Sequence, residues 1–258
     1  MSFDHMNPDK FADSAGVPWE GRAFEPNAFA GDDGSADPAL ISAIEQLHAG
    51  TGSIVDVIDA LRNARLLIPL LANLGEAGEG AHGQTVDKSA DLSIVTVETP
   101  DQQNGLPVFS SVAAMANWNK DARPVPHSAV KAALAAASEG NSRMILDAGS
   151  ATEFVVRRPA IEAIAQELPW LPSYDDIEVK AAFGQALDDF DEFAGWSIAA
   201  GDPMSLLASA EVELTLNLAR SFTQEEFAEL MQKVAANISE SEVIALKVDS
   251  LRVKLATA

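Results

Sequence analysis

The residue pattern with the clearest chemical meaning is a glycine motif, G-x-G-x-x-G, that runs from Gly78 to Gly83. In dinucleotide-binding proteins this motif follows a strand and opens a helix, whose N-terminus receives the pyrophosphate. A strand is predicted over residues 65–72, before the motif, but residues 84–87 lead into another predicted strand instead of opening a helix. We therefore interpret residues 75–83 as a flexible glycine-rich loop between strands, and we expect no dinucleotide cofactor.

The sequence lacks the usual signatures of nucleophilic and metal-assisted catalysis. It has no cysteine, and none of its four histidines has the H-E-x-x-H spacing of a zinc hydrolase. The serines show no G-x-S-x-G, S-x-x-K or P-loop pattern, which leaves open a triad assembled from distant positions. The acidic run at residues 188–192 lacks the spacing of a calcium loop, and we interpret it as the solvated face of a helix. We predict no catalytic residue, no metal and no cofactor.

A candidate interaction surface combines an aromatic side chain with several cations. Its residues are Trp118, Lys120, Arg123, Arg157 and Arg158. The first three lead into a rigid Pro-x-Pro between two predicted helices, and the last two add positive charge in the same predicted domain. Trp and Arg are frequent at binding hot spots, which favours an interaction site. The alternative is that Trp118 packs between the helices while the cations are solvated.

Helices and strands alternate through the first two thirds of the chain. Asp37-Pro38 is typical of a helix start, and Ser53 with Asp56 resembles a capping box at the start of a second helix. Residues 91–98 and 106–109 predict a hairpin, in which Pro107 lies at an edge or faces away from its partner strand. The remaining predictions are a strand over 65–72, a helix from Ser110 or Ser111 to Trp118, a helix over 128–139, strands over 143–147 and 153–157, and a helix from Pro159.

A break follows at residues 169–173, where two prolines and a rise in acidity predict a linker. Beyond it, Val212–Leu218 alternates between apolar and polar residues, which predicts a strand. We expect Arg252 and Lys254 of a closing strand to lie opposite Glu211 and Glu213 if the two strands pair. The other predicted elements are a helix from Asp176, a strand over 196–198 and a helix capped by Thr223. The domains expected are an extended arm (1–36), a first domain (37–168) and a second domain (174–258).

Composition sets further bounds on function. The 258 residues carry a net charge of −22, of which residues 51–165 contribute only −4. Such a charge opposes binding to nucleic acid or to anionic lipid, so we expect neither partner. The N-terminal residues do not resemble a secretory signal and the longest apolar run is short, which predicts a cytoplasmic protein outside the membrane. Together with the element order, these features predict an α/β (α+β) fold of two small mixed-sheet domains with helices packed on the sheets.

The sequence also resembles the SseB family, most closely its actinobacterial branch, over most of residues 16–168. The residues that carry the resemblance are 21–22, 29–38, 66–71, 90–97, 106–111, Trp118, 123–126, 144–150 and 154–156. The C-terminal half resembles the second domain of the family more loosely. One departure is Asp147-Ala148, where the family often has Asn-Pro. The resemblance implies an α/β domain and brings no catalytic residues.

Two functional hypotheses follow. The first is a cytoplasmic, non-enzymatic protein that binds or regulates another protein through the arm and the segment from Trp118 to Pro126. The second is a small-molecule-binding or catalytic protein with a pocket at the strand ends of the sheet.

Overall fold

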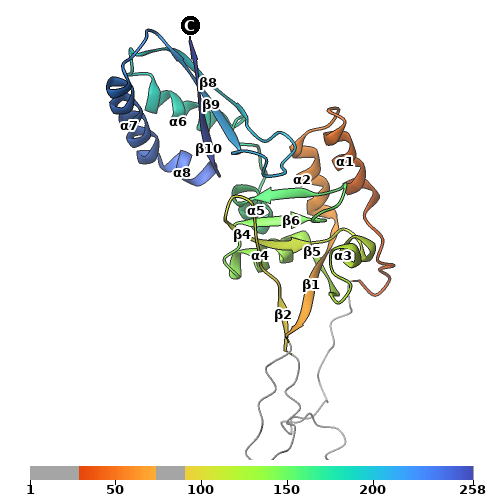
Figure 1. Ribbon diagram of the computed structural model, residues 1–258. Coiled ribbons are helices and arrows are strands. Elements are labelled where there is room, and N and C mark those ends of the chain that lie inside the picture. The colour runs from red at the N-terminus through yellow and green to blue at the C-terminus, as the bar shows by residue number, and fades with distance from the viewer. Residues whose placement is uncertain (1–28, 74–90, 258) are drawn as a thin grey trace, which may run out of the picture. The chain divides into compact units, whose positions relative to one another are not determined.

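The computed structural model describes residues 29–73 and 91–257 (Figure 1). The predicted glycine-rich loop, residues 84–87 after it and most of the predicted arm lie outside the described residues. The chain divides into two units, residues 1–33 and 34–258. In the first, the described residues form a turn in which the Asp32 N–H donates to the Phe29 carbonyl over 3.0 Å. The second has a mixed α/β fold, with eight helices and three small sheets among its described residues, which confirms the predicted fold class.

The first two helices begin at the caps that the sequence predicts. Asp37 caps α1 (Pro38–His48), because its Oδ1 accepts a hydrogen bond from the Ala39 N–H over 2.8 Å. At α2 (Ile54–Asn63) Ser53 and Asp56 form the expected capping box, in which each side chain accepts from the backbone N–H of the other residue. These bonds satisfy N–H groups that a helix start leaves without partners.

A three-stranded antiparallel sheet follows, in the order β2-β1-β5. Its strands are β1 (Arg65–Asn73), β2 (Asp91–Ile94) and β5 (Arg123–Ser128). The prediction of a rigid loop between two helices is therefore partly wrong, because Arg123–Ser128 forms a strand that pairs with β1. In this pairing Pro124 lies opposite Pro69 and Pro126 opposite Leu67. Because the Leu67 backbone bonds with Phe109 on the other side of β1, the proline nitrogens face away from β1, where a strand needs no donor.

The second sheet is mixed and has the order β3-β4-β6-β7. Its strands are β3 (Val97–Glu98), β4 (Asn104–Val108), β6 (Arg143–Leu146) and β7 (Phe154–Arg157). The predicted hairpin survives only as the short β3–β4 pair, since residues 91–94 join the other sheet. The Asp147 N–H donates to the Val108 carbonyl of β4, so the backbone of Pro107 faces away from β6. The prediction for Pro107 was therefore wrong, because β4 is an inner strand and the proline lies on the β3 side of it.

Helices pack on both of these sheets and bury two hydrophobic clusters. They are α3 (Val112–Trp118), α4 (Ala129–Ser138) and α5 (Arg158–Ala165), each at its predicted place in the chain. The largest buried cluster joins α1, α2, α4 and α5 to the apolar residues of β1, β4, β6 and β7. A smaller cluster of Leu67, Phe109 and Met115 lies under α3.

The C-terminal residues build a third sheet with its own core. Its order is β10-β9-β8, and its strands are β8 (Phe193–Ala200), β9 (Val212–Leu218) and β10 (Leu251–Thr257). Three helices lie beside this sheet in Figure 1, namely α6 (Ile177–Leu187), α7 (Gln224–Glu240) and α8 (Glu242–Lys247). Val212, Leu214 and Leu216 of β9 are buried against α6, α7 and α8. The predicted cross-strand pairing is confirmed for Glu213, which bonds with both Arg252 and Lys254.

Candidate functional site

The first part of the predicted interaction surface lies at the end of α3. Trp118 is half-buried and packs on the fully buried Phe109, with 5.3 Å between the ring centroids. Lys120 and Arg123 are exposed, and neither forms an ion pair with a described residue. Trp118 is thus part of the small core under α3, while the two cations face solvent. A binding role for these three residues stays a prediction.

Arg157 and Arg158 lie elsewhere, among acidic and carbonyl oxygens of the C-terminal part of the chain. Arg157 ends β7 and is buried, and its Nη2 donates to Asp202 Oδ2 over 2.6 Å. Arg158 is half-exposed, bonds with Glu162 on its own helix and donates to the carbonyl of Ala245. No hydrogen bond or ion pair therefore joins these two arginines to Trp118, Lys120 or Arg123.

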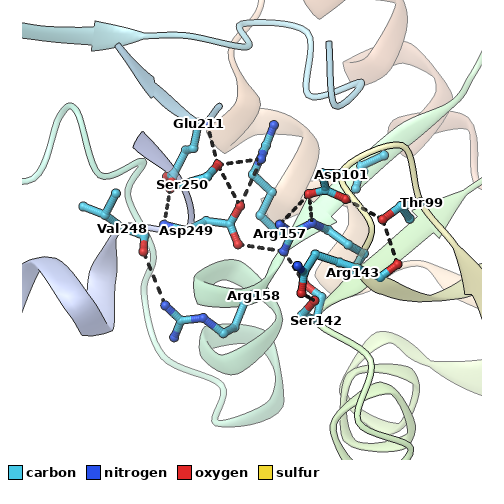
Figure 2. A network of polar contacts seen from close by, with 12 residues as sticks. Thr99, Asp101, Ser142, Arg143, Arg157, Arg158, Glu211, Val248, Asp249 and Ser250 are labelled. Atoms are coloured by element: carbon cyan, nitrogen blue, oxygen red, sulfur yellow. Dashed lines mark hydrogen bonds and ion pairs between the residues drawn. The ribbon is translucent and has the colours of Figure 1, made fainter. Parts of the chain in front are cut away.

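Asp249, in the loop before β10, is the centre of this polar network (Figure 2). Its Oδ1 accepts from Arg143 Nη1 over 2.7 Å, and its Oδ2 accepts from Arg157 Nη1 over 3.0 Å. Arg143, in β6, also donates to Asp101 through two nitrogens, at 3.1 and 2.7 Å. The side chains of both arginines and of Asp249 are buried, so one carboxylate bridges two cations in an environment where charge is poorly solvated.

This arrangement stabilises the buried charges and leaves few hydrogen-bond donors for a ligand. Burial lowers the pKa of Arg157, but hydrogen bonds and the charges of Asp202 and Asp249 outweigh that effect and raise it above the ordinary value. The donors of Arg143 and Arg157 point at carboxylates and carbonyls of the chain itself. An added anion would have to displace those oxygens, so we interpret the network as structural.

Beside the network, Glu211 has an unusual hydrogen-bond geometry. Its Oε1 lies 2.6 Å from Ser173 Oγ, which also lies 2.6 Å from the Lys247 carbonyl. A serine hydroxyl has one hydrogen, so it can serve only one of these acceptors at a time. Protonated Glu211 satisfies all three groups, because it donates to Ser173 while Ser173 donates to Lys247. Burial raises the pKa of Glu211, in agreement with this arrangement, although bonds from Ser173 and Asp249 act in the opposite direction.

A pocket beside β7 is lined by Arg157, Tyr174, Asp202 and Glu211 together with apolar residues. Its interior space of about 20 Å³ has room for roughly one water molecule. Burial, followed by the charges of Asp175, Glu211 and Asp202, raises the pKa of Tyr174 to about 12, so its hydroxyl keeps its proton at neutral pH. The pocket is too small for a metabolite in this conformation. Among residues 29–73 and 91–257, no three His, Cys, Asp or Glu side chains form a group that could hold a metal ion.

A second buried polar cluster lies at the turn after β6. Asp147 has a φ of +48° and accepts from the Ser110 N–H at 2.7 Å, Ser110 Oγ at 2.6 Å and Thr152 Oγ1 at 2.8 Å. The carboxylate thus fixes the start of the α3 segment against the β6–β7 turn. No histidine among the described residues is bonded to Ser110, and its side chain is buried, so this serine is positioned as a structural donor.

A groove with apolar walls lies between α5, residues 166–173 and α8. It encloses about 430 Å³. Three leucines on its walls are at least half exposed: Leu168 at 50%, Leu171 at 56% and Leu246 at 64%. Trp170 also lines it, half-buried. We call this feature the leucine groove.

The rim of the leucine groove is acidic. Lys247 is held by Asp176 at 2.7 Å and by Glu178 at 2.6 Å. Glu167 and Asp175 are exposed next to lining residues and form no ion pair with a described residue. Large apolar side chains in one concave, charged-rimmed place are typical of an interaction site.

The fold and these sites define a mixed α/β protein without a recognisable catalytic centre among its described residues. Residues 39–163 match the family model for the SseB protein N-terminal domain. This match agrees with the resemblance noted in the sequence over that part of the chain. No curated protein and no solved structure gives a significant match. In addition, no helix in the described ranges has the length and apolar character needed to span a membrane.

Sequence reasoning missed the network and the leucine groove. One signal for the network was present, because Arg157 ends the strand Phe-Val-Val-Arg, of which every residue is buried. A charged residue in a continuous apolar strand indicates a buried partner. For the groove, the signal was the pair of leucines around Pro169-Trp170 in the predicted linker.

Proposed function

We propose that this protein is a non-enzymatic, cytoplasmic binding or regulatory protein of the SseB family, and that the leucine groove receives its protein partner. We further propose that it falls in the actinobacterial branch and that its C-terminal part is the second domain of that family. The observation that supports the binding function is the exposure of Leu168, Leu171 and Leu246 around one concave space. Exposed apolar patches of this kind mark interaction surfaces in soluble proteins.

The acidic rim indicates the chemistry of the partner. Glu167 and Asp175 add negative charge beside the leucines, and Lys247 is neutralised by its two acidic neighbours. A helix with an apolar face and flanking basic residues would complement both features. This conclusion uses the local charge of the groove and not the net charge of the whole chain.

The test compares two substitutions of equally exposed leucines. Leu171→Asp changes the wall of the groove, whereas Leu134→Asp changes α4, where Leu134 is 53% exposed and does not line the groove. Both variants and the unaltered protein are cross-linked in cells and purified, and the affinity of any shared partner is then measured. We expect the Leu171 variant to bind the purified partner at least about tenfold more weakly, while the Leu134 variant binds normally. Equal binding by both variants would contradict the groove assignment.

The second hypothesis, a small-molecule-binding or catalytic protein, makes a different prediction. Its site would be the pocket beside β7, which would have to open to admit a metabolite. A thermal-shift screen distinguishes the two functions, because a ligand that binds the folded state raises the melting temperature. Stabilisation by one metabolite, abolished by Tyr174→Ala and unaffected by Leu171→Asp, would favour the second hypothesis.

A further inference from the structure

Strand edges in this fold differ in how well they are protected against added strands. An exposed edge carries unpaired N–H and C=O groups, and proteins block it with prolines, bulges, short strands or covering segments. On the outer edge of β5, the nitrogens of Pro124 and Pro126 carry no hydrogen to donate. The outer edge of β7 is covered, because the Val155 N–H donates to the Ser205 carbonyl over 2.8 Å and Ser205 Oγ donates back over 2.7 Å. Strands β2 and β3 have four and two residues, and β8 contains a bulge at Phe193.

The outer edge of β10 has none of these protections. The Val212 N–H donates to the Ser250 carbonyl, which fixes the register of the parallel β9–β10 pair. Because backbone groups alternate along a strand, Arg252 and Lys254 direct theirs toward β9. Those of Leu251, Val253 and Leu255 point away from the sheet, and no described residue pairs with them. The strand has seven residues and no proline.

The side chains along β10 offer two chemically different faces. Val253 lies beside Leu214 and Leu255 beside Leu216, so both continue the apolar row of β9. At the edge they remain 37% and 43% exposed. On the opposite face, Arg252 and Lys254 share one carboxylate, that of Glu213, which leaves an excess of positive charge there.

We propose that the outer edge of β10 binds an extended segment of another protein by strand addition. The segment has apolar residues beside Val253 and Leu255 and an acidic residue beside Arg252 and Lys254. Backbone hydrogen bonds to Leu251, Val253 and Leu255 hold the added strand, and the alternation of apolar and acidic side chains selects it. This surface is separate from the leucine groove and takes a partner of opposite charge.

Charge argues against a second copy of this chain as the occupant. Two antiparallel β10 strands centred on Val253 would place Arg252 of one copy opposite Lys254 of the other, and like charges in that position are destabilising. The net charge of the protein is negative, but charges beyond about 8 Å are largely screened at physiological salt. The local excess of positive charge therefore governs the contact.

The experiment uses the full chain and two synthetic peptides of about ten residues, the length of a long strand. In the first peptide Val alternates with Thr and Glu, and in the second Lys replaces Glu. We expect the acidic peptide to slow amide hydrogen exchange at Leu251, Val253 and Leu255 by about tenfold or more, since those N–H groups become bonded. Fluorescence anisotropy should show the basic peptide binding about tenfold more weakly. Equal affinity for the two peptides, no binding of either, or protection elsewhere would overturn the proposal.

Two variants and one control test the same contact. Val253→Pro removes the central outward donor, and Lys254→Gln removes one cation while keeping the pairing with β9. Lys180→Gln removes an equally exposed cation from α6 and serves as the control. We expect both β10 variants to weaken binding of the acidic peptide by about tenfold and the control to leave it unchanged. If Val253→Pro fails to fold, the affinity of the Lys254→Gln variant for the acidic peptide tests the proposal. Protection of the three amides that rises with protein concentration, without peptide, would mean that a second copy occupies the edge and that the proposal is wrong.

Discussion

Arg157 Nη1 donates a hydrogen bond to Asp249 Oδ2 over 3.0 Å, although 92 residues separate the two in the chain. The same carboxylate accepts from Arg143 through its other oxygen. One aspartate in the loop before β10 therefore bridges cations at the ends of two neighbouring strands, β6 and β7. The buried position of all three residues makes each of them depend on the others, because an unpaired buried charge is costly.

Asp249→Ala should strongly destabilise the folded protein. It leaves Arg143 with Asp101 and Arg157 with Asp202 as carboxylate partners, and we expect a loss of about 3–5 kcal/mol in the free energy of unfolding. Urea denaturation measures this loss. Glu162→Gln is the control, since its pair with Arg158 is largely exposed and should contribute about 0.3–0.5 kcal/mol. A cost for Asp249→Ala as small as that of the control would show that the network contributes little.

The raised pKa of Glu211 predicts a specific pH dependence of stability. The folded state keeps a proton on this group at pH values where the unfolded chain, with a pKa near its ordinary value of 4.5, has released it. The stabilisation from this group is fully present below that value and is lost as the pH rises through the folded-state pKa. Glu211→Gln keeps a neutral donor toward Ser173 and an acceptor for the Asp249 N–H. We expect this variant to be at least as stable as the unaltered protein at pH 7.

Denaturation curves of both proteins between pH 4 and pH 8, roughly the range over which a raised glutamate pKa would act, isolate the contribution of Glu211. The stability difference should shift in favour of the variant as the pH rises. A variant that is clearly less stable at pH 7 would mean that the ionised carboxylate is required.

Trp118→Ala should destabilise the protein through lost packing on Phe109. Because Trp118 is half-buried, we expect a loss of about 1–3 kcal/mol, less than for a fully buried aromatic residue. Lys120→Ala and Arg123→Ala, at exposed positions nearby, should change the free energy of unfolding by no more than about 0.5 kcal/mol. If guanidinium denaturation finds all three variants equally stable, the Trp118 ring contributes little to the core under α3 and its face is available to a partner.

Asp147 offers a paired comparison at the turn after β6. Asn tolerates a positive φ and can both accept from the Ser110 N–H and donate to the two hydroxyl oxygens, so Asp147→Asn should cost about 1 kcal/mol or less. Asp147→Ala leaves the buried Ser110 N–H without an acceptor and should cost about 2–4 kcal/mol. Thermal unfolding of the two variants checks the order. An Asn variant as unstable as the Ala variant would show that the negative charge is required.

Local patterns were sufficient for most of the elements. Asp37, Ser53 and Thr223 cap helices at the positions where their sequences predict caps, because capping depends only on residues within one turn. Strand β9 was equally clear from its alternation. Local patterns failed where the structure of a segment depends on its partner strand. Residues 91–98 were predicted as one strand, but their two halves join different sheets.

The strand β5 shows why proline misled the prediction. Pro124 and Pro126 are two residues apart, so both nitrogens face the same side of the strand, while Val125 and His127 keep their donors for β1. A proline at every second position is compatible with an edge strand. Short α8 was missed for a different reason. Ser241 ends α7 and caps α8 at once, and no sequence break separates the two helices.

The network around Asp249 was beyond sequence reasoning, because no spacing relates Asp249 to Arg143 or Arg157. The strand context of Arg157 indicates a buried partner but does not say which of 39 acidic residues supplies it. The same holds for the leucine groove, whose walls come from α5, residues 166–173 and α8.

Asp249 lies outside the segment that matches the SseB N-terminal domain, yet Arg143 and Arg157 lie within it. The matched segment therefore does not contain all the charges that its own buried residues require. The strands of the C-terminal sheet contribute no apolar residue to the core of the matched segment. Unfolding that sheet would nevertheless weaken this core, because the arginines of β6 and β7 would lose the carboxylate of Asp249. The two hydrophobic cores are coupled in this way, and the consequence is cooperativity: they should unfold in a single transition, with the guanidinium groups as the link.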